Sequence, residues 1–369
     1  MCRKMRTLLD RGSRHLRPTA TPVILSPIMR FSSPLDFFST LGDRALVAWK
    51  SVDFNPSDFP RIASTTLAAL PPSEHIKPMD LFGQFLNSDK VPAQSTSGFG
   101  QPELIVFENN RFYIQVLVWM DGSTDVHQHL FDGAFHVMHG SSIHSRFAFD
   151  DMREVSAHLR TGTLRMTSTE LLVAGQTVPI TAGTGFIHSL FHLDSPSLTV
   201  VIRTHTSPGA GPQFTYLAPH IAIDPFLADT LTLRRKQILD TLEALQDPTY
   251  PDAVLECLAE LDFERGFFIL QNCAETLHLH GAWSKVFKAF RKKHGPKANL
   301  IPPTLAGIRE RDHLVALRSE VTDPELRFFL ALKLNLPEES ERLRLIRKRF
   351  KGDPRERIKR WENDLQELT

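Results

Sequence analysis

The sequence predicts an α+β protein of more than one domain, in which an antiparallel β-barrel or sandwich lies between N-terminal helices and an all-helical C-terminal domain. Three observations support this class. Residues 34–100 hold short apolar segments punctuated by Pro, Ser and Asp, which is typical of capped helices. Residues 101–206 hold many short runs rich in β-branched and aromatic residues, separated by Gly, Asp, Ser and Pro. Residues 214–369 show apolar residues three and four apart, the helical period.

The N-terminal residues 1–33 are predicted to be a basic, disordered extension. The first 30 residues carry seven Lys and Arg against one acid, Asp10, and their longest apolar segment is PVIL. This segment is too short for a secretory signal. An organelle transit peptide is the alternative, and a start of the native protein at Met29 stays open.

The composition is that of an ordinary soluble protein. Of the 369 residues 41% are hydrophobic and 23% charged, and the formal net charge is +1. This charge gives no general reason to expect a nucleic acid or an anionic membrane as partner. Three cysteines are too few for a disulfide framework, and no apolar run approaches the roughly 20 residues of a membrane span. We therefore expect a cytoplasmic protein that binds neither membrane nor nucleic acid.

The helical C-terminal domain has no evident role in the sequence. Residues 207–213, SPGAGPQ, are predicted to be a linker before it. Its basic segment 342–361 lacks groove-reading or stacking features, so we interpret the charges as the solvated face of a helix. Homodimerisation, a lid and partner docking all remain open.

The segment GSTDVHQHLFDGAFHVMHG, residues 122–140, suggests a metal site. His127 and His129 are two residues apart, and on a strand such residues point to the same face. The pair His278 and His280 lies in a helical stretch, where the same spacing makes the two rings diverge. The best further ligand is His188, 61 residues after His127, in TAGTGFIHSLFHLD.

Together these two segments resemble the signature motifs of the cupin superfamily over roughly residues 104–206. The first family motif is Gly, His-x-His, Glu and Gly, which matches Gly122, His127, His129 and Gly140, with Gly133 at the Glu position. The second is a Pro-x-Gly-x-x-His turn with Asn four residues later, which matches residues 183–188, with His192 at the Asn position. The resemblance implies a cupin jelly-roll core with His127, His129 and His188 as metal ligands.

The departure at Gly133 resembles the thiol dioxygenases, the cysteine-dioxygenase group of cupins. A three-histidine face without the carboxylate leaves coordination positions open, and the resemblance implies non-haem Fe(II). Neutral imidazoles also suit Zn, Ni and Cu. That group has a Ser-x-His-x-Tyr triad before a Ser-Pro turn. Here those positions hold Ile202, Thr204 and Thr206, and His205 is displaced by one residue. Cysteine is therefore a doubtful substrate.

Further residues are candidates for ligand support or substrate binding. Asp125 and Asp132 are close enough in sequence to accept hydrogen bonds from the ligands, and Asp132 is also a candidate displaced ligand. Strand alternation places His139 inside the barrel if Gly133 points inward, and His192 is a candidate neighbour or fourth ligand. Other candidates lie on the predicted strands: Arg203, Arg146 and Arg165 for an anionic substrate, and Tyr113 as a hydrogen-bond donor. We identify no catalytic acid or base.

Two classes of function follow. The first is a mononuclear non-haem Fe(II) oxygenase or dioxygenase, an oxidoreductase that takes O₂ and a small organic substrate, either anionic or neutral. A Zn or Ni isomerase or hydrolase is its nearest alternative among enzymes. The second class is a non-catalytic cupin that senses a metal or small ligand and acts through its helical domain.

Overall fold

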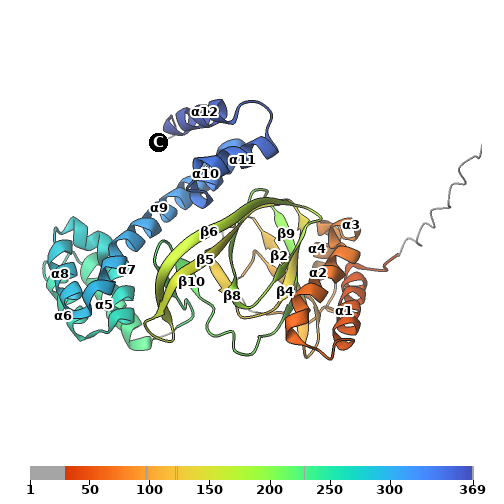
Figure 1. Cartoon of the computed structure of the whole chain (residues 1–369), viewed down its shortest axis with the longest axis horizontal. Helices are drawn as coiled ribbons and strands as arrows, with labels where there is room; N and C mark the ends of the chain where they lie inside the picture. The colour runs from red at the N-terminus through yellow and green to blue at the C-terminus, as the bar shows by residue number, and fades with distance from the viewer. Residues whose placement is uncertain (1–29, 96–98, 121, 123, 228, 368–369) are drawn as a thin grey trace, which may run out of the picture.

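The computed structural model describes residues 30–95, 99–120, 122, 124–227 and 229–367. Residues 1–29 of the predicted extension lie outside the described residues. The elements follow the predicted order of helices, strands and helices (Figure 1). The helices are α1 (Pro34–Lys50), η1 (Pro56–Asp58), α2 (Phe59–Ala69), α3 (Pro72–His75), α4 (Pro78–Asn87), α5 (Thr230–Ala244), α6 (Tyr250–Glu260), α7 (Phe263–Leu279), α8 (Trp283–His294), η2 (Gly295–Leu300), α9 (Ile301–Glu320), α10 (Pro324–Asn335), α11 (Glu339–Arg349) and α12 (Pro354–Gln366).

The strands form two sheets that enclose a common interior. They are β1 (Glu103–Glu108), β2 (Phe112–Trp119), β3 (His127–His129), β4 (Gly133–His139), β5 (Ser141–Glu154), β6 (Leu159–Val173), β7 (Thr177–Ile180), β8 (Gly183–His192), β9 (Ser197–Thr204), β10 (Thr215–Leu217) and β11 (Ile221–Ile223). One sheet has the order β1-β2-β9-β4-β7. The other is a closed barrel in the order β10-β11-β6-β5-β8-β3. All the strand pairs of both sheets are antiparallel.

The five-stranded sheet is buried on both faces. On β2, Ile114 and Val116 pack into a core shared with the N-terminal helices. The alternate residues Gln115, Leu117 and Trp119 line the interior of the barrel. Because both faces are covered, the strand is a nearly continuous apolar run and shows little polar alternation. The sequence therefore predicts the strand without showing which face points inward.

The N-terminal helices cover the outer face of this sheet. The Ser33 side chain caps α1 by accepting a hydrogen bond from the Asp36 N–H, and Pro34 occupies the first turn. Phe37 and Leu41 of α1 and Phe59 of α2 are fully buried in the shared core. These helices lie on the opposite side of the barrel from α5–α8 (Figure 1).

The barrel extends beyond residue 206, where the sequence placed its end. The strands β10 and β11 pair with β3 and β6 and complete the closed sheet. The predicted linker 207–213 is held against the barrel, since the Ser207 hydroxyl donates a hydrogen bond to Asp132. The helical region begins at Thr230. β10 and β11 have only three residues each and follow a segment rich in Pro and Gly, so they are too short to show a periodic pattern in the sequence.

The C-terminal helices form two groups on the barrel. The α5–α8 group has a core that includes Leu159 and Ile221 of the barrel. Helix α9 runs from this group to α10–α12, whose core includes Ile143 and Phe191 of the barrel (Figure 1). Within the described ranges, no helix combines the length and apolar character needed to cross a bilayer.

Candidate metal centre

Strand pairing brings three histidines together inside the barrel. His127 and His129 lie on β3, and both are buried. His188 lies on β8 directly opposite His127 in the antiparallel pair. One ring nitrogen of each histidine lies within 4.8 Å of the others. The residues that the sequence assigns as metal ligands therefore share one site.

The ring nitrogens are oriented for a common ligand. His129 Nε2 and His188 Nε2 are 2.8 Å apart. Nitrogen ligands about 2.1 Å from one ion lie roughly 3 Å apart, so this pair needs only a small adjustment to share an ion. The Nδ1–H of His127 donates to the backbone carbonyl of Asp125 over 2.7 Å, which leaves its Nε2 as the ligand atom.

Burial keeps all three rings neutral, which is the form that binds a metal. Desolvation lowers the pKa of His127. It lowers the pKa of His129 well below the ordinary value, with smaller contributions from His127 and Arg203. The pKa of His188 is also well below that value, first through burial and then through the neighbouring histidines. A proton-free imidazole keeps its lone pair at neutral pH, so the donor set fits a borderline transition metal.

The histidines line a cavity of about 540 Å³ inside the barrel. Its walls are largely apolar and aromatic, and they include Phe99, Leu117, Trp119, Phe131, Phe135, Ile180, Leu190 and Val201. Its polar residues include Glu103, Tyr113, Gln115, Thr124, Thr199 and Arg203. A cavity of this size, with a mainly apolar surface and several polar groups, is typical of a site for a small organic molecule.

Arg203 and Tyr113, both predicted from the sequence, lie on one wall of this cavity. They are paired residues of β9 and β2. The Arg203 guanidinium lies 3.5 Å from the centre of the Phe131 ring and 5.0 Å from that of Tyr113. Gln115 is buried, and its Oε1 has no hydrogen-bond partner within the described part of the chain. The sequence did not single out this glutamine.

Two predicted histidines lie elsewhere. His139 is exposed at the end of β4, so its predicted inward position is wrong. A bulge between Val137 and His139 interrupts the alternation on which that prediction relied. His192 is buried but does not belong to the histidine group. Its ring stacks on Trp119, and its Nδ1 hydrogen-bonds to the hydroxyl of Ser142.

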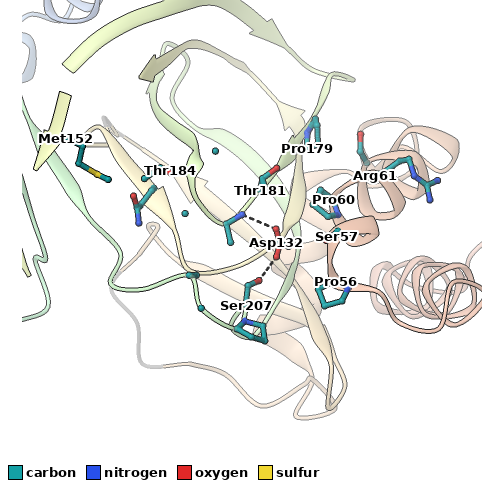
Figure 2. A pocket seen from close by; sticks show the side chains of 18 of the residues that line it. Pro56, Ser57, Pro60, Arg61, Asp132, Met152, Pro179, Thr181, Thr184 and Ser207 are labelled. Carbon is teal, nitrogen blue, oxygen red and sulfur yellow. Dashed lines mark hydrogen bonds between the residues drawn. The ribbon is translucent and has the colours of Figure 1, made fainter. Parts of the chain in front are cut away.

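Asp132 lies beside an open groove of about 940 Å³ and connects the segments at Ala182 and Ser207 by hydrogen bonds. Its carboxylate accepts hydrogen bonds from the Ala182 N–H at 2.9 Å and from the Ser207 hydroxyl at 2.5 Å (Figure 2). Both carboxylate oxygens are thus engaged, and Asp132 is not part of the histidine group. The predicted role as a displaced ligand is therefore not supported by its position.

Gly133 permits close packing of two strands. It pairs with Arg203 on β9, and a Cβ at this position would lie 2.1 Å from the carbonyl oxygen of Ile202. The absence of a carboxylate here is thus linked to the approach of β4 and β9, which the motif comparison does not reveal. Among the described residues, no carboxylate or cysteine joins the three histidines.

The remaining predicted residues are held outside the cavity. Arg146 packs on the ring of Phe186 and donates to the Gly185 carbonyl. Arg165 forms an exposed ion pair with Asp150. The Asp125 carboxylate pairs with Arg311, so this residue supports His127 through its backbone and not through its side chain.

Two residues behind His188 are not indicated by the sequence. The His188 Nδ1 lies 3.2 Å from the Nε2 of His144 on β5. The Nδ1 of His144 lies 3.1 Å from Oε1 of Glu170 on β6. The segment SIHSRFAF gave only an alternation that places His144 on one face, and nothing local indicates that this face meets β8.

Comparison with known proteins gives structural similarity only. No protein-family model matches the chain, and no curated protein sequence matches it. Hydroquinone 1,2-dioxygenase from Sphingomonas sp. TTNP3, with 4-hydroxybenzoate bound, is 11% identical with a TM-score of 0.23. The match covers 29% of this chain and 68% of that one. A cupin-2 domain containing protein from Shewanella frigidimarina is 19% identical with a TM-score of 0.22, over 35% of this chain and 94% of that one. A cupin superfamily protein from Desulfitobacterium hafniense is 13% identical with a TM-score of 0.21, over 31% and 94% of the two chains.

These partial matches assign no activity. The decisive observation is that two antiparallel sheets enclose a His-x-His strand and a third histidine on its paired neighbour. This is the arrangement that the resemblance of the two histidine segments to cupins implies. N-terminal helices cover one sheet of the barrel, and the all-helical region packs on the other.

Proposed function

We propose that this cupin is a mononuclear non-haem Fe(II) oxygenase that acts on a small organic anion. The observation that carries the proposal is the convergence of three neutral, buried imidazoles in the wall of a cavity of the barrel, without a carboxylate among the described ligand candidates. Such a donor set leaves positions for both a substrate and O₂. When bound, Fe(II) supplies the means to activate O₂ beside the substrate.

The cavity walls would bind and orient the substrate. Arg203 donates from Nε and Nη2 to the carbonyl oxygens of Thr204 and His205, so its remaining N–H groups would bind a carboxylate. Its packing on Phe131 fixes the plane of its guanidinium. Glu103 lines the same cavity and favours a substrate that also carries a donor or positive group. Within the described residues the Oε1 of Gln115 has no partner, so it would accept a hydrogen bond from such a group. The aromatic walls exclude water from the reacting centre.

A non-catalytic sensor is the second candidate, and one set of contacts favours it. Arg311 of α9 donates to Oδ1 of Asp125 at 3.2 Å, two residues before His127. Arg318 of the same helix donates to the carbonyl of His192 at 2.7 Å. These contacts join the helical region to the segments that carry the histidines. A ligand that moves His127 would act on α9 through Asp125, whose carbonyl accepts from the His127 ring and whose carboxylate accepts from Arg311.

The metal content of anaerobically purified protein tests the proposal, with His188→Ala measured beside the wild type. Near-stoichiometric iron that His188→Ala loses would support the site, and O₂ consumption with small carboxylates would support the reaction. Zinc or nickel lost in the same way, with O₂-independent turnover, would indicate an isomerase or hydrolase. Tight ligand binding without turnover would support the sensor. The absence of metal from both proteins after reconstitution would refute the oxygenase.

A further inference from the structure

Three residues on adjacent strands form a hydrogen-bonded chain behind the metal centre. The chain runs from His188 Nδ1 to His144 Nε2 over 3.2 Å, and from His144 Nδ1 to Glu170 Oε1 over 3.1 Å. Glu170 lies directly opposite His144 in the β5–β6 pair. His144 lies opposite Leu190 in the β5–β8 pair, which makes His188 its diagonal neighbour on the same face.

The chain has a fixed direction because its outer end can only accept. An ionised carboxylate has no proton to donate, so the Nδ1 of His144 carries the hydrogen that bonds Glu170. The Nε2 of His144 is then a bare acceptor, and the Nδ1 of His188 must be the donor to it. This leaves the Nε2 of His188 without a proton, and that atom faces His129.

The surroundings keep this order. His144 and His188 are almost completely buried, so water does not offer either ring another partner. The side chain of Glu170 is 51% exposed and keeps the outer end of the chain in contact with solvent. The hydrogen bond with His144 lowers the pKa of Glu170, and the charges of Lys348 and Arg146 act in the same direction.

We propose that Glu170 and His144 are positioning residues that hold His188 in the tautomer whose Nε2 binds the metal. The inference rests on the metal site of the proposed function and does not depend on the reaction. Outer partners of metal-bound histidines typically change metal affinity by about 10–100-fold when they are removed. We expect an effect of that size from Glu170, although it touches neither the metal site nor the cavity.

The test is Glu170→Gln in the full chain, measured with two readouts. Glutamine is isosteric, and at a half-exposed position it is expected to leave the fold intact. Its amide can donate to His144 Nδ1 and so reverse the chain. We expect Zn²⁺ affinity, measured by competition with a chromogenic chelator, to fall by about 10–100-fold. In the metal-free protein, side-chain ¹⁵N NMR should find the His188 proton on Nδ1 in the wild type and a population on Nε2 in the variant.

Glu154→Gln is the matched control, because it removes the same charge from the same pair of strands at an exposed position. We expect this variant to keep the wild-type Zn²⁺ affinity and the wild-type tautomer. Equal Zn²⁺ affinity and an unchanged tautomer in Glu170→Gln would overturn this inference alone. A wild-type protein that binds no Zn²⁺ would overturn the metal site and this inference together. Metal binding that depends on Glu170, without O₂ consumption, would support the inference and count against the oxygenase.

Discussion

The close approach of β4 and β9 at Gly133 makes a single methyl group costly. In Gly133→Ala the new Cβ would lie 2.1 Å from the Ile202 carbonyl oxygen and 3.0 Å from the Arg203 Cα. Both neighbours are backbone, so neither can rotate away. β4 is also paired with β7 on its other side, where Gly133 lies opposite Ile180. The strand therefore cannot retreat without disturbing a second ladder.

The expected destabilisation follows from these contacts. Overpacking in a tight core costs about 1–3 kcal/mol, and a weakened ladder hydrogen bond adds about 1 kcal/mol. The alanine reduces the entropy of the unfolded chain, which offsets roughly 0.4–1 kcal/mol. We therefore expect a net loss of about 1–3.5 kcal/mol. For a large domain this corresponds to a fall in Tm of roughly 2–14 °C.

Thermal and urea unfolding of Gly133→Ala test this reasoning, with Gly185→Ala as the control. A Cβ at Gly185 would meet Thr181 Cγ2 at 3.7 Å and Thr181 Cβ at 3.9 Å, both ordinary contacts, so this variant should be at least as stable as the wild type. If Gly133→Ala and Gly185→Ala have the same Tm and the same free energy of unfolding, the strands are not as close as the structure places them. Gly133→Glu would place a longer side chain at the same close contact, and we expect this variant to unfold the barrel.

Three further predictions concern other buried groups. Burial lowers the pKa of His136 to about 4 and that of His192 to about 3, so below pH 6.5 the unfolded chain takes up protons that the folded chain does not. Each histidine therefore lowers the free energy of unfolding by about 2 kcal/mol as the pH falls from 8 to 5. In His136→Gln, the free energy of unfolding measured in urea should fall by about 2 kcal/mol less than in the wild type over that interval. An equal loss in both proteins would contradict this. Arg203→Gln should weaken the binding of small carboxylates, measured by calorimetry, at least about tenfold, while the exposed Arg165→Gln should leave it unchanged. Equal weakening in the two variants would mean that Arg203 makes no specific contact with the carboxylate. Asp132→Asn should lower stability by about 1.5–3 kcal/mol and keep the zinc stoichiometry of the wild type, and loss of zinc would make Asp132 a ligand after all.

The candidate site was partly predictable because strand periodicity is local. Residues that are two apart on any strand share a face, so His127 and His129 could be placed together without knowledge of the strand that pairs with theirs. The family motif then supplied His188, and β3 does pair with β8 at that residue. His139 shows the limit of the same rule. Its position depended on an uninterrupted strand, and a single bulge turned it to the surface.

The sequence by itself determined the order of helices, strands and helices, since apolar period and cap residues act over a few neighbours. It also identified three histidines as candidate metal ligands. Only the tertiary structure decided that Arg203 and Gln115 face the same cavity and that β9 approaches β4 closely at Gly133. It also decided that Glu170 is connected to His188 by hydrogen bonds through His144. These relations join strands far apart in the chain. They depend on register and sheet closure, which many residues fix together and no short segment encodes.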